Sequence, residues 1–148
     1  MPQAEAENTI KSYPGVFSCV IPVKWGDMDA LNHVNNAVYF QYMEEARAQL
    51  FQRAGLAMPA KKIGILAHVS CDFVKPILYP ETIEVRLAIS KVGRSSLTMT
   101  ALICQQGNIN QVYAKASFVL VGANATTGKI EAWTSGEVAA LAGCLVTE

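Results

Sequence analysis

Hydrophobic and polar residues alternate near the start of the chain and through its second half, with a stretch of different period between them. Alternation over residues 17–25 predicts a first strand. Within it, Pro22 favours the edge of a sheet, because proline cannot donate a ladder hydrogen bond. From Ala37 to Gly55, apolar residues recur at steps of three and four, which is typical of an amphipathic helix. The chain is therefore predicted to begin with one strand that leads into one long helix.

The predicted helix has three faces of different character. Its most apolar row consists of Tyr39, Met43, Ala46, Leu50 and Ala54. A neighbouring row contains Phe40, Arg47 and Phe51, and the opposite side carries Gln41, Glu45, Gln49 and Gln52. Asn35 or Asn36 suits the N-cap, and Gly55 suits the C-terminal end. The apolar row requires a second surface that covers it.

The second half of the chain is predicted to form four more strands and a short helix. The alternating segments are residues 63–73, 82–90, 96–103 and 112–120. In the first of them, Ile63, Ile65, Ala67, Val69, Cys71 and Phe73 are expected to share one face. Turns at Gly93-Arg94 and Gly107-Asn108 predict antiparallel hairpins. Thr134 and Glu137 form a capping box for a short helix over residues 135–142.

This order of elements predicts an α+β domain. One face of the sheet must cover the apolar row of the helix, so the sheet is expected to curl around it. The arrangement is the hotdog fold, a curled antiparallel sheet wrapped around one long central helix. Residues 16–148 are predicted to form this single domain. Residues 1–15 are polar, carry Pro2 and Pro14, and are predicted to be a flexible N-terminal arm.

Composition and charge narrow the possible functions. Of the 148 residues, 51% are hydrophobic and only 16% are charged, which predicts that part of the surface is hidden in an oligomer. Twelve basic and twelve acidic residues cancel, and no basic stripe is present, so nucleic-acid binding is not expected. No apolar run approaches the roughly 20 residues of a membrane span. We therefore expect neither a nucleic acid nor a membrane as a partner.

The cysteines bear on compartment and on metal binding. Four cysteines lie at wide, irregular spacings with no C-x-x-C, so a zinc site is not expected and reduced thiols are. The N-terminus lacks the basic and apolar regions of a signal peptide. The sequence therefore predicts a cytoplasmic protein.

The densest group of polar side chains comes just before the predicted helix. Residues 27–36 contain two acids, three asparagines and one histidine. Backbone N–H groups at the start of a helix have no intrahelical partner and attract negative charge. Such a loop suits acyl-group chemistry, in which negative charge develops on a carbonyl oxygen. No G-x-S-x-G occurs, which removes the commonest hydrolase alternative.

This loop and the helix after it resemble a known signature. Asp27-Met-Asp29-Ala-Leu-Asn-His-Val-Asn-Asn36, followed by Ala37-Val-Tyr-Phe-Gln-Tyr-Met-Glu-Glu-Ala-Arg47, is similar to the motif of hotdog-fold acyl-CoA thioesterases. The 4-hydroxybenzoyl-CoA thioesterase group is closest in length and layout. The His-Val-Asn-Asn element is also similar to that of long-chain acyl-CoA thioesterases and of plant acyl-carrier-protein thioesterases.

The resemblance implies roles for four residues of the loop. Asp29 would act as nucleophile or as general base for water, and a backbone N–H near Asn36 would hold the thioester carbonyl. The bacterial group often has glycine where this chain has Asn32. In the plant enzymes an Asn and the following His of a similar element have catalytic roles, so Asn32 and His33 are further candidates. Asp27 is interpreted as a structural partner of nearby N–H groups.

The sequence also suggests residues that contact the substrate, and the resemblance implies how subunits assemble. Tyr39, Tyr42 and Met43 would form either the core or the wall of an acyl pocket, and Arg94 and Ser95 would contact the phosphates of coenzyme A. The resemblance implies homodimers joined sheet edge to sheet edge, often paired into homotetramers, with active sites at subunit interfaces. It implies no metal and no tightly bound cofactor. The substrate would be an acyl-CoA or acyl-carrier-protein thioester, and the acyl group is left open.

Two other functions remain open from the residues alone. Hydroxyacyl-thioester dehydratases or hydratases share the fold and pair a loop histidine with a helix carboxylate, which His33 with Glu44 or Glu45 could imitate. The chain lacks their His-Phe-Pro-Gly type of loop. The third possibility is a non-catalytic acyl-CoA binding module, against which the acids of the loop argue.

Overall fold

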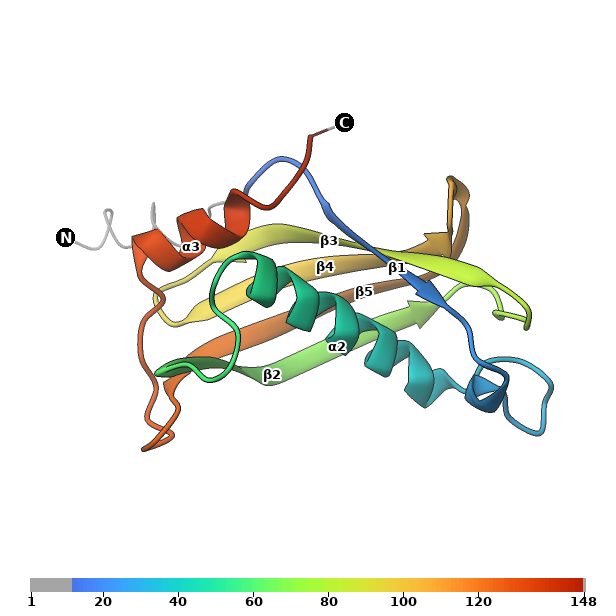
Figure 1. Cartoon of the computed structure of the whole chain (residues 1–148), viewed down its shortest axis with the longest axis horizontal. Coiled ribbons are helices and arrows are strands. Elements are labelled where there is room, and N and C mark those ends of the chain that lie inside the picture. The colour runs from blue at the N-terminus through green and yellow to red at the C-terminus, as the bar shows by residue number, and fades with distance from the viewer. Residues whose placement is uncertain (1–11, 148) are drawn as a thin grey trace.

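The computed structural model describes residues 12–147, and most of the predicted N-terminal arm lies outside this range. The elements are β1 (Phe17–Pro22), η1 (Trp25–Asp27), α2 (Asn36–Arg53), β2 (Lys62–Phe73), β3 (Thr82–Val92), β4 (Ser96–Gln105), β5 (Asn108–Asn124) and α3 (Ser135–Ala142). Figure 1 shows α2 lying across one face of the sheet, with α3 beside the end at which β2 begins. The predicted order of elements and the hotdog fold are both confirmed.

The five strands form one antiparallel sheet in the order β1-β3-β4-β5-β2. β1 therefore lies at one edge, as Pro22 predicts, and β2 lies at the other. The inward side chains of the central strands, such as Leu87, Met99 and Phe118, are fully buried. They pack against the predicted apolar row of α2, in which Met43, Ala46 and Leu50 are also buried. This shared core fixes α2 along the sheet.

Helix α2 begins and ends as its sequence predicts. The Asn35 side chain caps it by accepting a hydrogen bond from Ala37 N at 2.8 Å. The helix ends at Arg53, and Gly55 follows with φ +77°, a left-handed conformation that glycine adopts without strain. The Asn35 cap places the start of α2 directly after the polar loop.

Strand β2 differs from its predicted pattern. Leu66 pairs with Leu120 and His68 with Val119, so Ala67 is an extra residue in a β-bulge. Beyond the bulge, Val69, Cys71 and Phe73 pair with inward-facing residues of β5, as predicted. Before it the faces exchange: Gly64 and Leu66 pair with inward residues, and the prediction for Ile63, Ile65 and Ala67 is wrong. One inserted residue reverses every side chain on one side of it.

The first strand is also shorter than predicted. β1 ends at Pro22, and Trp25 begins a 3-10 turn in which its side chain is 77% exposed. The described part of the N-terminal arm is attached to the sheet, because Tyr13 N donates to Ile89 O at 3.2 Å. No helix within residues 12–147 is long and apolar enough to cross a membrane.

Helix α3 closes the end of the fold opposite the polar loop. Its predicted capping box is confirmed, since Thr134 and Glu137 exchange side chain to backbone hydrogen bonds. Lys62 binds Glu137 at 2.7 Å and the carbonyl of Ala132 at 2.6 Å, which fastens this helix to the start of β2. The segment that leads into α3 passes close to β5 at Gly122, where a Cβ would lie 2.4 Å from Glu131 O.

Candidate active site at the start of helix α2

The polar loop before α2 is anchored to the segment between β2 and β3. Val23 N donates to Glu81 O and Val34 N donates to Ile77 O, both at 2.9 Å. Val34 and Ile77 are fully buried. The loop is therefore held at both ends against the body of the domain, at the end of the sheet where β2 finishes (Figure 1).

Asp27 holds the loop together. Its Oδ2 accepts hydrogen bonds from Lys24 N at 2.9 Å and from the Tyr42 hydroxyl at 2.8 Å. Its carbonyl accepts from Asn35 N. Burial and the neighbouring Asp27 carboxylate raise the pKa of Tyr42, so the phenol stays a hydrogen-bond donor. The loop is thus tied to the second turn of α2, and Tyr42, predicted to contact substrate, makes this tie.

Asp29 is two residues further on and is half-buried. Its backbone closes a tight loop, with Asp29 N donating to His33 O and Asn32 N donating to Asp29 O, both at 3.0 Å. Its Oδ1 accepts from Leu31 N at 2.8 Å. Among the described residues, no hydrogen bond uses its Oδ2. One carboxylate oxygen is therefore held by the loop and the other is unbound, and Asp29 itself is not among the residues that line the cavity beside Asn36.

Asn32 and His33 have different surroundings within the same turn. Asn32 has φ +65°, a left-handed conformation that asparagine and glycine tolerate best. Glycine, which the resemblance implies at this position in the bacterial group, would also meet this backbone requirement. The His33 ring is half-buried, with Nδ1 3.3 Å from Val34 O. His33 faces a cavity, whereas Asn32 is among the lining residues of none of the cavities described below.

The first turn of α2 leaves one backbone donor unused. Ala37 N is bound by the Asn35 side chain and Val38 N by the Asn35 carbonyl. Asn36 N has no acceptor among residues 12–147, as expected for the first residue of a helix. A cavity of about 230 Å³ adjoins this point and is lined by His33, Asn36, Tyr39, Phe73, Val74, Lys75 and Pro76. An anionic oxygen in this cavity would meet a free N–H and the positive end of the helix.

The aromatic residues of α2 lie deeper than Asn36. Tyr39 is 2% exposed, and its hydroxyl accepts from Ile77 N at 3.3 Å. Its ring contacts Phe73 edge to face, with centroids 5.1 Å apart, and lines the cavity. Met43 is 1% exposed in the core, where a substrate reaches it only if other side chains move. Of the predicted acyl contacts, Tyr39 therefore borders the cavity in this structure.

Arg94 and Ser95 lie far from Asp29 within one subunit. They form the turn after β3, beside Trp133 and Gly122, to which their carbonyls are bonded. The loop that contains Asp29 adjoins the other end of β3, at Glu81. The 11 residues of this strand span roughly 35 Å. The predicted phosphate contacts and the predicted catalytic group are therefore at opposite ends of the sheet.

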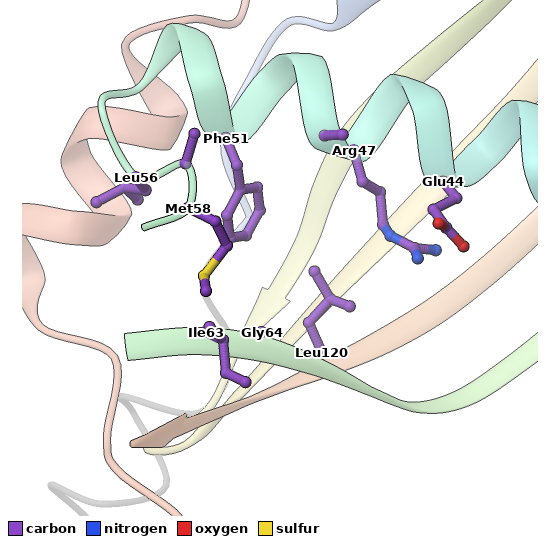
Figure 2. A pocket seen from close by; sticks show the side chains of 10 residues that line it. Glu44, Arg47, Phe51, Leu56, Met58, Ile63, Gly64 and Leu120 are labelled. Carbon is purple, nitrogen blue, oxygen red and sulfur yellow. The ribbon is translucent and has the colours of Figure 1, made fainter. Parts of the chain in front are cut away.

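A second, larger cavity lies between α2 and β2 and was not predicted as a site. Its volume is about 440 Å³, and its walls come from α2, the loop after it, and strands β2 and β5. Figure 2 shows Arg47 and Phe51 pointing from the helix toward the strands, with Met58 beside Phe51, while the Ile63 side chain points from β2 away from the helix. The sequence feature that could have indicated this cavity is the row of Phe40, Arg47 and Phe51, which lies beside the buried face of the helix. No group of three or more His, Cys, Asp or Glu side chains within residues 12–147 is placed to hold a metal.

Comparison with known proteins identifies the family. Residues 23–141 match the Thioesterase-like superfamily. The uncharacterized protein YsmA of Bacillus subtilis is 26% identical over 118 residues, which are 79% of each chain. The structure of the PA2801 protein of Pseudomonas aeruginosa superposes with a TM-score of 0.80 at 29% identity, covering 88% of this chain and 99% of that one.

A more distant structure shares the fold. The 1,4-dihydroxy-2-naphthoyl-CoA thioesterase of Synechocystis has a TM-score of 0.76 at 20% identity, over 86% of this chain and 96% of that one. The chain belongs to the Thioesterase-like superfamily and is a hotdog-fold thioester hydrolase. The resemblance seen in the polar loop is thereby confirmed. Within one subunit, His33 and Glu44 line different cavities.

Proposed function

We propose that the protein hydrolyses acyl-CoA thioesters to the free acid and coenzyme A. The thioester carbonyl binds at the start of α2, where its oxygen accepts a hydrogen bond from Asn36 N. Asp29 either attacks the carbonyl carbon or takes a proton from the water that attacks it. The observation that carries this proposal is the Asn36 N–H, which has no acceptor among the described residues and adjoins a cavity, next to a loop that holds the half-buried Asp29 carboxylate.

The chemistry needs few groups because a thiolate is a good leaving group. The Asn36 N–H and the helix dipole stabilise the oxyanion, a contribution of roughly 3 kcal/mol from one such donor. If Asp29 is the nucleophile, a mixed anhydride forms as the thiolate leaves, and water then cleaves the anhydride. If Asp29 is the base, water adds directly and the thiolate leaves as the tetrahedral intermediate collapses. His33 borders the cavity and contacts the bound thioester in either case.

The proposed active unit is a dimer joined through β2. This strand pairs with β5 on one side only, and its free edge exposes Ile65 (44%), Leu66 (43%) and Phe73 (42%). A long apolar edge strand favours pairing with another strand. A two-fold axis makes the new pair antiparallel, so the Phe73 end of one β2 lies beside the Lys62 end of the other. Each thioester site then borders the α2–β2 cavity of the partner subunit.

The same pairing bears on the phosphates of coenzyme A. Arg94 and Ser95 lie at the Lys62 end of the sheet, far from the Asp29 of their own subunit. Antiparallel pairing moves the partner's turn toward the thioester site, which supports their proposed role across the interface. The chain carries no net charge and offers no broad field to attract an acidic carrier protein, which favours coenzyme A. Its four cysteines are all unpaired, in keeping with a reducing compartment such as the cytoplasm.

Substitution of Asp29 tests the proposal. Asp29→Asn and Asp29→Ala should lower kcat by about a thousandfold or more, while the melting temperature and the oligomeric state persist. Asp72→Asn, which changes an exposed carboxylate on β2, serves as the matched control and should stay fully active. A screen over short, long and aryl acyl-CoA and acyl-carrier-protein thioesters provides the assay. Full activity in both Asp29 variants would remove Asp29 as the catalytic group.

A further inference from the structure

The α2–β2 cavity has one cation, Arg47, and one carboxylate, Glu44, in a mostly apolar wall. Phe51, Leu56, Met58, Ile63 and Leu120 form most of its surface, and Arg47 and Glu44 lie at one end (Figure 2). A site of this volume is within the usual range for a small ligand, roughly 300–1,000 Å³. Its polar end therefore bears on which acyl groups it accepts.

The Arg47 side chain is held by an aromatic ring and has no hydrogen-bond partner in the part of the chain that the structure describes. Its guanidinium carbon lies 5.0 Å from the centre of the Phe118 ring, a cation–π contact that uses none of the N–H donors. Among residues 12–147, no hydrogen bond or ion pair engages the Arg47 side chain. Burial lowers the pKa of Arg47 and the nearby Glu44 carboxylate raises it, and the guanidinium stays charged. Arg47 is thus a half-buried charge with its donors unused.

An acyl group that enters the cavity displaces water from these donors. A plain hydrocarbon chain has no acceptor to replace the water, so the guanidinium is left desolvated and unpaired. A carboxylate at the end of the chain forms two parallel hydrogen bonds with the guanidinium. Sites that present buried polar groups reject analogues that cannot pair with them.

We infer that Arg47 binds a carboxylate at the far end of the acyl group, so that the enzyme prefers thioesters of dicarboxylic acids. The inference rests on the proposed function, in which this cavity takes the acyl chain of a thioester bound by the partner subunit. The chain passes Ile63 and Met58 first and then meets Arg47. Glu44 competes for Arg47, but its side chain is exposed and can turn to solvent, where its charge is screened.

The first experiment compares octanoyl-CoA with octanedioyl-CoA, which differ only in the terminal carboxylate. The wild-type enzyme should prefer octanedioyl-CoA by about tenfold or more in kcat/KM. Arg47→Met should lower kcat/KM for octanedioyl-CoA by roughly tenfold to a hundredfold and raise it for octanoyl-CoA, because the variant removes the charge that a hydrocarbon chain leaves unpaired. Glu44→Gln should raise kcat/KM for octanedioyl-CoA, since it removes a repelling charge. Arg53→Met is the matched control, because Arg53 is exposed on the same helix and stacks on Phe17 instead.

The second experiment asks whether Arg47 acts across the interface. Differently tagged Asp29→Asn and Arg47→Met chains are coexpressed, and mixed dimers are purified. If Arg47 serves the partner's site, one of the two sites in each mixed dimer has both residues intact and regains wild-type preference for octanedioyl-CoA. If Arg47 serves its own subunit, no intact site exists and the preference stays lost, which contradicts the inference.

Other outcomes separate this inference from the proposed function. Hydrolysis of both substrates that depends on Asp29 but shows no preference would overturn the inference and leave the thioesterase intact. An Arg47→Met protein that sediments as a monomer would make Arg47 an interface residue and would also overturn it. Absence of hydrolysis for every thioester in the panel would refute the proposed function, and the inference with it.

Discussion

Two aspartates stand two positions apart in the loop before α2, and their hydrogen bonds give them different tasks. Asp27 has two donors on one oxygen and a third on its carbonyl, so it is committed to structure. Asp29 has one side-chain oxygen bound and one unbound. The sequence assigns these roles correctly for Asp27, because an acid at the end of a short turn suits nearby N–H groups. It does not foresee that Tyr42, fifteen residues later, supplies a donor to Asp27.

Removal of the Tyr42 hydroxyl should loosen the loop that carries Asp29. Tyr42→Phe deletes a hydrogen bond to a half-buried carboxylate, so we expect a loss of about 1–2 kcal/mol in the free energy of unfolding. A catalytic group that shifts slightly loses rate, and kcat should fall by about tenfold with a smaller change in KM. Chemical denaturation and steady-state kinetics measure both. Tyr13→Phe is the control, since the Tyr13 hydroxyl has no partner among the described residues, and equal effects in both variants would contradict the role of Tyr42.

Among the helices and strands, α2 supplies the backbone donor of the candidate site at its first residue. The helix begins at Asn36 because Asn35 caps it, and the cap leaves the Asn36 N–H unpaired. Sequence alone predicts this end well, because an asparagine followed by an apolar period of three and four indicates a capped helix. The cavity beside it also needs Phe73 at the end of β2 and Lys75 just after that strand, which no local pattern brings there.

Two substitutions at position 36 distinguish the contribution of the backbone N–H from that of the Asn36 side chain. Asn36→Pro removes the N–H at the first helical position, where proline is well tolerated, and Asn35 already has the extended ψ of 136° that precedes proline. We expect kcat to fall by roughly a hundredfold to a thousandfold with little change in melting temperature. Asn36→Ala keeps the N–H and should retain activity. If alanine were as harmful as proline, the amide side chain, and not the backbone, would hold the substrate.

Strand β2 shows where sequence patterns stop being informative. Its alternation predicts one continuous face, yet the bulge at Ala67 exchanges the faces of Ile63 and Ile65 relative to Val69. Before the bulge the strand is apolar on both sides, with Ile63 and Ile65 on one and Leu66 on the other, so period alone cannot locate the inserted residue. The bulge also decides the cavity, because it turns Gly64 inward, where Trp133 and α3 pack against the start of the strand. Local sequence therefore predicts the polar loop and the start of α2, but it does not predict the cavity between α2 and β2.

The whole molecule leaves one long sheet edge uncovered. β1 is a short edge strand that ends in a proline, whereas β2 has 12 residues and exposed apolar side chains. The low share of charged residues in the sequence predicts such a hidden surface, but composition cannot say which strand provides it. In the proposed dimer, β2 lies between the cavity beside Asn36 of one subunit and the α2–β2 cavity of its partner, so the proposal makes activity depend on assembly.

A single charge at the centre of β2 tests this connection. Ala67 is exposed at the bulge, near the middle of the strand, so in an antiparallel pair it lies close to the same residue of the partner. Ala67→Lys places two like charges beside the two-fold axis, and we expect monomers in sedimentation velocity and loss of thioesterase activity. Val20→Lys places the same charge on the other edge strand, where the wild-type side chain is 47% exposed, and should leave assembly and activity unchanged. A monomeric Ala67→Lys protein with full activity would show that each subunit holds a complete site, whereas an intact dimer would place the interface elsewhere.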